Sequence, residues 1–292
     1  MLYLYFKYTQ EIALFKVIDG LKNKLDQKRP LSDLMSKNLQ EYLILHWTYH
    51  SNAIEGNALR LLETKVVLEG IAVGGKKLKD HFEVINHRDA IYYVEDIIKK
   101  EEPFSEWQIC NIHQLILKNI DDDNAGRYRQ QNVLISGTTN TPPDYTLLND
   151  KMAQLVDWYN TQADLMHPIE RAAKVYADFV GIHPFIDGNG CTSRLLLNLE
   201  LLKAGYPPCV ITVENYLAYH EALDQWMAYG KTKPFIQLVA DAVLEGFKPY
   251  QVVIGFSVHD KFHRTLILSG FCLLKIAKIS LNSSFFPKPI KR

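Results

Sequence analysis

Apolar residues recur at three- and four-residue spacing through most of this 292-residue chain. This period is typical of amphipathic helices, whereas a half-buried strand shows strict alternation of apolar and polar residues. The clearest example is residues 167–181, where one helical face would carry Ile169, Ala172, Ala173, Tyr176, Phe179 and Val180. The pattern therefore predicts an all-α fold.

Helix-starting and helix-ending residues divide this pattern into separate helices. The spacing predicts helices over 9–27, 32–50, 61–70, 81–99, 105–120, 149–160, 167–181 and 191–204. The segment 121–148 breaks the rhythm, because it combines an aspartate run, a Val-Leu-Ile triplet, glycines and a Pro-Pro pair. It is predicted to form a short β-hairpin or extended flap.

Three regions are expected along the chain. Residues 1–103 are predicted to hold N-terminal helices, 104–240 the central functional domain, and 241–292 a C-terminal appendage. The last part of the appendage, from residue 261 onward, has seven Lys or Arg and no acidic residue. Such tails are usually solvated.

Composition limits the classes of partner. The 33 basic residues balance the 33 acidic ones, so no overall positive charge favours nucleic acid or an acidic membrane. No apolar run reaches the roughly 18 residues of a membrane span, and the N-terminus does not resemble a signal peptide. The four cysteines are scattered, without a C-x-x-C pair, which fits a reducing compartment. We therefore expect a cytoplasmic protein that binds neither nucleic acid nor a membrane.

The segment 183–194, His-Pro-Phe-Ile-Asp-Gly-Asn-Gly-Cys-Thr-Ser-Arg, concentrates the chemistry. Gly188 and Gly190 allow successive backbone N–H groups to face one anion at the start of a helix, and Arg194 lies one turn inside that helix. Asp187 offers a hard oxygen for magnesium, and His183 can accept a proton near neutral pH. Taken singly, these residues would favour a turn and a capping histidine. Together they indicate phosphoryl or nucleotidyl transfer.

Other histidines are weaker candidates. His46 and His50 lie four residues apart on one helical face, as in some metal sites, but no third ligand is evident, which favours interior or capping roles. His81 and His87 belong to a segment with alternating charge, and we expect them to be exposed to solvent.

The twelve-residue segment closely resembles the motif of the Fic family, His-Pro-Phe-x-Asp/Glu-Gly-Asn-Gly-Arg-x-x-Arg, whose members transfer AMP from ATP to protein hydroxyls. The resemblance covers roughly residues 47–242. Residues 51–57, Ser-Asn-Ala-Ile-Glu-Gly-Asn, resemble the inhibitory-helix motif in its class II position, N-terminal to the core. Residues 126–138 resemble the flap that aligns a target side chain. The resemblance implies a Fic-fold helical bundle with a β-hairpin flap.

The resemblance also implies residue roles. His183 would deprotonate a Ser, Thr or Tyr hydroxyl of a target protein, and Asp187 would hold Mg2+ on the phosphates of ATP. Glu55 would pair with Arg194 and restrain the reaction. The nucleotide contacts implied are Ile135, Ser136, Gly137, Thr138, Asp187, Gly188, Asn189, Gly190, Cys191, Thr192, Ser193, Arg194 and His220. The same glutamate serves AMP removal in related animal enzymes, and homodimers are frequent in the family.

Cys191 departs from the motif, because the family has its first arginine at this position. A neutral thiol cannot neutralise phosphate charge, and the loss of one charged contact costs about 1.5–3 kcal/mol. Two alternatives therefore stay open beside a weakened transferase. One is a catalytically impaired regulator that only binds nucleotide. The other is a cysteine hydrolase in which the Cys191 thiol has a depressed pKa near His183.

Overall fold

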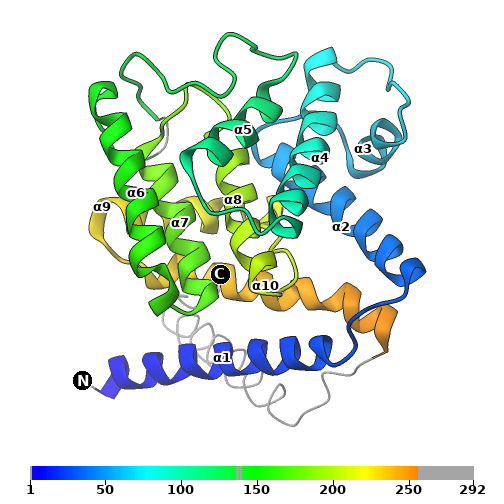
Figure 1. The fold of residues 1–292 in the computed structure, drawn as a ribbon, viewed down its shortest axis with the longest axis vertical. Coiled ribbons are helices and arrows are strands. Elements are labelled where there is room, and N and C mark those ends of the chain that lie inside the picture. The colour runs from blue at the N-terminus through cyan, green and yellow to red at the C-terminus, as the bar shows by residue number, and fades with distance from the viewer. Residues whose placement is uncertain (1, 136–137, 139, 256–292) are drawn as a thin grey trace, which may run out of the picture.

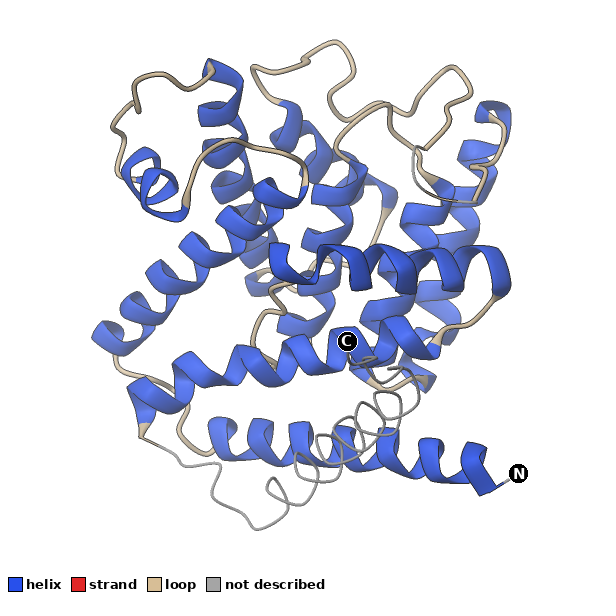
Figure 2. Ribbon diagram, turned by 180° about the vertical axis from the view of Figure 1, so that it is seen from behind, coloured by secondary structure: helices blue, strands red, loops and turns tan. Residues whose placement is uncertain are grey.

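The computed structural model describes residues 2–135, 138 and 140–255, with side chains from residue 13 onward. The α-helices are α1 (Leu2–Asp26), α2 (Asp33–Ile54), α3 (Leu61–Leu68), α4 (Leu78–Lys99), α5 (Glu106–Leu117), α6 (Leu148–Gln162), α7 (Pro168–Ile182), α8 (Asn189–Lys203), α9 (Tyr216–Tyr229) and α10 (Lys233–Ile254). The described part of the chain contains no strand (Figure 2), so the all-α class predicted from the sequence is confirmed.

Helix α8 is the centre of the molecule (Figure 1). It is buried on nearly all sides, because its leucines point into two separate apolar clusters. Leu197 and Leu201 pack in a cluster with α1, α7, α9 and α10. Leu195 and Leu199 pack in the other, with α2, α4, α5, α6 and α7. A helix that is apolar all round belongs in a protein interior, and its first turn is consequently held by neighbours on every side.

Helix α10 runs across the boundary expected between residues 240 and 241. Val239 and Phe247 are both fully buried in the same cluster as Leu25 of α1, so the two ends of the described chain pack together (Figure 1). The basic segment from residue 261 onward lies outside the described residues. No helix in the described part of the chain has the length and apolarity that crossing a bilayer requires.

The expected flap is an extended loop in its described residues. The buried Arg129 side chain holds it by donating hydrogen bonds to the carbonyl oxygens of His183 (2.9 Å), Gln131 (2.8 Å) and Pro143 (2.7 Å). Side-chain to backbone bonds thus replace strand pairing in residues 130–135 and 140–144.

The expectation that His81 and His87 are exposed is wrong. His87 is fully buried, with Nδ1 3.1 Å from the hydroxyl oxygen of Thr48, and burial lowers its pKa to about 3. His81 accepts a hydrogen bond from the backbone N–H of Val73 at 2.9 Å. Both histidines fall on the buried stripe of α4 that includes Val84, so helical phase outweighs the alternating charges around them.

Candidate functional site

The site is built on the six-residue connection between α7 and α8, residues 183–188. His183 ends α7 in the left-handed conformation (φ 51°, ψ 59°), with its N–H donating to the carbonyl oxygen of Phe179 at 3.0 Å. Gly188 begins α8 with φ 73°. A side chain is rarely tolerated at such angles, which makes His183 a strained position and explains the glycine at 188. The connection therefore turns sharply and brings the proton acceptor of the motif beside the first turn of α8.

Asn189 locks this connection from within. Its side-chain oxygen accepts the N–H of Phe185 at 3.0 Å, and its side-chain nitrogen donates to the carbonyl oxygen of Phe185 at 2.8 Å. The side chain is buried. Asn189 therefore stabilises the conformation of the connection. From the sequence it was expected to contact a phosphate.

His113 of α5 is a supporting residue that the sequence analysis missed. Its ring stacks on Phe185 with 3.6 Å between ring centroids. Nδ1 accepts the N–H of Gly126 at 2.9 Å, so Nε2 carries the proton and donates to the carbonyl oxygen of Asp187 at 2.9 Å. Burial lowers the pKa of His113 to about 4. A Cβ at residue 188 would lie 3.2 Å from this ring, a second reason for Gly188. No local sequence pattern distinguishes this histidine from an ordinary core residue.

Arg194 is held from three directions in the first turns of α8. Its Nε donates to the hydroxyl oxygen of Ser51 at 2.9 Å. Its Nη2 lies 3.0 Å from the carbonyl oxygen of Ser51, 2.7 Å from Oε1 of Glu55 and 3.4 Å from Sγ of Cys191. The side chain is only 3% exposed, and Nη1 is buried without a hydrogen-bond partner in the described structure. One donor of the guanidinium therefore stays available for an anion.

Glu55 sits where an anion would bind. It follows α2 directly, and its carboxylate pairs with Arg194 against the first turn of α8. A Cβ added at Gly190 would collide with this carboxylate, so the glycine makes room for it. Backbone N–H groups at a helix N-terminus favour negative charge. The Glu55 carboxylate thus lies against the first turn of α8, beside Gly190 and Arg194.

The surroundings of Cys191 do not favour a nucleophilic thiolate. Its side chain is 7% exposed, and Sγ accepts from the Ser51 hydroxyl at 3.8 Å as well as from Arg194. Burial raises the pKa of the thiol to about 11, so it is protonated at neutral pH. The depressed pKa that a cysteine hydrolase requires is therefore contradicted.

Thr192 and Ser193 face the interior of the molecule. Both are fully buried, and the Ser193 hydroxyl donates to the carbonyl oxygen of Gly190 at 2.8 Å. Their side chains are consequently turned away from the anion position, which leaves only their backbone groups to contact a nucleotide.

His183 and Asp187 retain the properties that their expected roles need. Burial and the charge of Arg129 lower the pKa of His183 to about 4, so its imidazole is neutral and able to accept a proton. Asp187 is exposed, with Oδ1 accepting the N–H of Gly188 at 2.7 Å. The described residues contain no cluster of three or more His, Cys, Asp or Glu that would hold a metal ion. A single carboxylate fits Mg2+, which is typically bound by one or two carboxylates together with substrate phosphates.

The flap and α9 border the site. Ile135 is half-buried, and the Thr138 hydroxyl donates to Oδ1 of Asp224 on α9 at 2.6 Å. Ser136 and Gly137 lie outside the described residues. Burial lowers the pKa of His220 on α9, with smaller effects from Glu55 and Arg194. The charges of both members of the ion pair act on the His220 imidazole, and its role in nucleotide binding stays a prediction.

The similarity of the chain to known proteins agrees with this site. The model of the Fic/DOC family matches residues 103–201. The chain is similar to the protein adenylyltransferase Fic of Nematostella vectensis, with 37% identity over 227 residues, which are 75% of this chain and 52% of that protein. It is also similar to the protein adenylyltransferase fic-1 of Caenorhabditis elegans, with 36% identity over 231 residues, which are 78% of this chain and 44% of that protein. The chain thus spans about half the length of these curated relatives.

Solved structures show the same fold. The structure of Fic-1 from C. elegans matches with a TM-score of 0.77 and 28% identity, covering 87% of this chain and 76% of that chain. A Fic domain containing signaling protein from Bacteroides thetaiotaomicron matches with a TM-score of 0.77 and 28% identity, covering 83% of this chain and all of that one (100%).

Proposed function

Because this chain belongs to the Fic/DOC family, we propose that it is a protein adenylyltransferase that transfers AMP from ATP to a hydroxyl group of a target protein. The observation that carries this proposal is the Glu55–Arg194 ion pair, 2.7 Å long, against the N-terminus of α8. A carboxylate held there indicates that the site is built for negative charge. The triphosphate of ATP is the anion that this chemistry uses.

The proposed reaction would take place at the N-terminus of α8. Backbone N–H groups of its first turn and the guanidinium of Arg194 would bind phosphate oxygens, and the restrained loop would keep them in place. The neutral imidazole of His183 would take the proton of the target hydroxyl, whose oxygen then attacks the α-phosphorus of ATP. Asp187 would hold Mg2+, which supplies charge neutralisation for the departing pyrophosphate. The flap segment that the sequence assigns to residues 135–138 would align the target by backbone pairing.

Glu55 would act as a restraint on this reaction. Its carboxylate occupies the first turn of α8 and uses the charge of Arg194 that the γ-phosphate needs. ATP and Glu55 would therefore compete for one position, and the resting protein would be a weak transferase. The same carboxylate is also suited to orient water for the removal of AMP.

Cys191 supports a second candidate, a nucleotide-binding regulator with little turnover. Its buried, protonated thiol brings no positive charge to the place where the Fic motif has an arginine. The cytoplasmic location, the homodimer and the absence of nucleic-acid and membrane partners stay predictions from the sequence.

The test is AMP transfer by the Glu55→Gly variant, measured as self-modification with labelled ATP and Mg2+ and located by mass spectrometry. Glycine is tolerated at a helix C-terminus, so the substitution removes the carboxylate with little disturbance of α2. We expect at least about ten-fold more labelling than in the unaltered protein, because one charged competitor is removed. The matched control, Glu55→Gly with His183→Ala, should bind ATP but not transfer AMP. If Glu55→Gly binds ATP and remains silent, the regulator is favoured; if both variants label equally, His183 is not the base.

A further inference from the structure

A small cavity lies beside the first turn of α8 and opens onto the proposed phosphate position. Asp187, Gly188 and Cys191 form one wall, Glu55 after α2 a second, and Lys79 and Glu83 of α4 a third. The cavity therefore borders the residue that departs from the Fic motif. It also brings α4, a helix outside the motif, to the site.

The charges around this cavity are unequal. Three carboxylates line it, whereas Lys79 is the single cation among its described lining residues. Cys191 contributes no charge, because burial raises the pKa of its thiol to about 11. With Glu55 displaced and Asp187 engaged by Mg2+, a phosphate group entering beside Cys191 would have Lys79 as the one cationic side chain among the described lining residues on this side, with Arg194 on the other.

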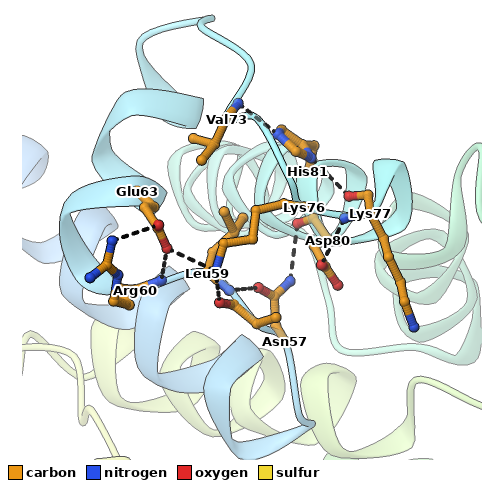
Figure 3. Close-up of polar contacts among 10 residues, drawn as sticks. Asn57, Leu59, Arg60, Glu63, Val73, Lys76, Lys77, Asp80 and His81 are labelled. Atoms are coloured by element: carbon orange, nitrogen blue, oxygen red, sulfur yellow. Dashed lines mark hydrogen bonds and ion pairs between the residues drawn. The ribbon is translucent and has the colours of Figure 1, made fainter.

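The start of α4 is tied to the turn that follows Glu55 (Figure 3). The side-chain nitrogen of Asn57 donates to the carbonyl oxygen of Asp80 at 3.0 Å and to Oε2 of Glu83 at 2.7 Å. The side-chain oxygen of Asn57 accepts the N–H of Leu59 at 2.9 Å. These bonds fix the backbone around Lys79 relative to Glu55, so the base of the lysine side chain is held at the edge of the cavity.

The ammonium group of Lys79, by contrast, is weakly held. Its Nζ lies 3.6 Å from Oε1 of Glu83, and the lysine side chain is 55% exposed. An exposed ion pair at this distance stabilises little. The flexible four-carbon stem of lysine allows the ammonium group to turn to another partner at low cost.

We propose that Lys79 supplies the positive charge that Cys191 does not. Once Glu55 has left, the ammonium group turns from Glu83 into the cavity and pairs with phosphate oxygens of ATP. Lys79 is then a nucleotide-binding residue provided by α4. This inference rests on the proposed function, because it assumes that ATP binds at the N-terminus of α8.

The experiment compares ATP binding by variants in the Glu55→Gly background. Isothermal titration calorimetry with ATP and Mg2+ gives Kd, and self-modification kinetics give KM and kcat. Lys79→Met should raise Kd and KM roughly ten-fold or more, because one charged contact is lost, while kcat changes less. Lys79→Arg should stay close to the parent. The matched control is Lys65→Met, since Lys65 is a similar α3 lysine, 58% exposed and 3.8 Å from Glu69, and should change Kd less than about two-fold.

A double substitution ties the effect to position 191. If Lys79 replaces the missing arginine, Lys79→Met should raise Kd less than about two-fold once Cys191→Arg is present, because the arginine then provides the contact. If Lys79 had only a structural role, Lys79→Met would lower the Tm, and Cys191→Arg would not restore ATP binding.

The inference and the proposed function fail in different ways. An unchanged Kd in Lys79→Met, or a loss that persists in full with Cys191→Arg, overturns the role of Lys79. An absence of ATP binding in Glu55→Gly overturns it as well. Binding of ATP that depends on Lys79 without transfer of AMP supports the role of Lys79 and refutes the transferase.

Discussion

Replacing His113 with phenylalanine removes the two hydrogen bonds that help to hold the connection between α7 and α8, and keeps the shape of the ring. Phenylalanine can still stack on Phe185, which lies 3.6 Å from the His113 ring centroid. It can neither accept the N–H of Gly126 nor donate to the carbonyl oxygen of Asp187. The variant therefore separates the hydrogen bonds of His113 from its packing.

The two lost hydrogen bonds set the expected size of the effect. A buried polar group without a partner costs about 1–3 kcal/mol. Asp187 is exposed, so water can replace part of its lost bond, whereas the N–H of Gly126 is less accessible. We expect the free energy of unfolding to fall by about 2–4 kcal/mol at pH 7.5, and Tm to fall by about 3–7 °C. The rate of AMP transfer by Glu55→Gly should fall with it, because the loop carries His183.

The size of the effect should depend on pH. Burial lowers the pKa of His113 in the folded protein to about 4, compared with about 6.5 in the unfolded chain. Its stabilising contribution is therefore complete above pH 6.5 and is lost as the pH falls toward 4. Between pH 7.5 and pH 5 this loss is about 2 kcal/mol, and only the protein with His113 experiences it. The difference in stability between the two proteins should narrow by that amount.

Urea unfolding at pH 7.5 and pH 5 measures both quantities. Asn198→Ala is the matched control, because the buried Asn198 side chain bonds the N–H and carbonyl oxygen of Cys209 at 2.6 and 2.9 Å and does not titrate. Its destabilisation should be the same at both pH values. A difference between wild type and His113→Phe that stays constant with pH, or a variant as stable as wild type, would refute the assigned role of His113.

Three further substitutions or reactions test neighbouring parts of the site. Asn57→Ala removes the bonds between the turn after Glu55 and α4, so self-modification with labelled ATP should rise several-fold above wild type; a lower rate would contradict a restraining role of that turn. Asn189→Ala removes both side-chain bonds to Phe185 and should lower kcat in the Glu55→Gly background by at least about ten-fold, with a smaller change in the Kd for ATP, measured by calorimetry. Alkylation of Cys191 by iodoacetamide at pH 8 should be more than about a hundred-fold slower in the folded protein than in urea, because its thiol is buried and has a raised pKa; rapid labelling, followed by mass spectrometry, would favour the hydrolase again.

Helices α1 to α8 were predictable because their signals are local, whereas α9 and α10 were not delimited from the sequence. Ser32 caps α2 by accepting the N–H of Met35, and the apolar stripe of α7 falls where the spacing placed it. The prediction was less accurate for α1, which begins at Leu2, seven residues before the predicted start at residue 9. It was also less accurate for the flap. The bonds of Arg129 to His183 and Pro143 join residues far apart in sequence, and hydrophobic periodicity contains no information about them.

The motif predicted which residues lie at the site, but not the structural role of each. Asn189 and His113 hold the loop through backbone groups of Phe185 and Asp187. The sequence pattern does not distinguish them from other residues of suitable shape with the same donors. His87 was misassigned because charge alternation was given more weight than helical phase. Lys79 was not considered at all, since only the packing of α4 against the turn after Glu55 brings it to the cavity beside Cys191.

The burial of Arg194 gives a physical reason for the proposal that the restraint and the substrate share one position. A guanidinium that is 3% exposed needs a negative partner, because an unpaired buried charge costs several kcal/mol. Ser51 satisfies part of its hydrogen-bonding capacity without any charge, and the Cys191 thiol is also neutral. In the proposed mechanism, Glu55 would therefore stabilise the resting fold by the same interaction that would exclude a phosphate. Its departure would become favourable only when another anion arrives, and the proposed turn of Lys79 toward that anion would lower the cost of the exchange on the side where the motif has lost its arginine.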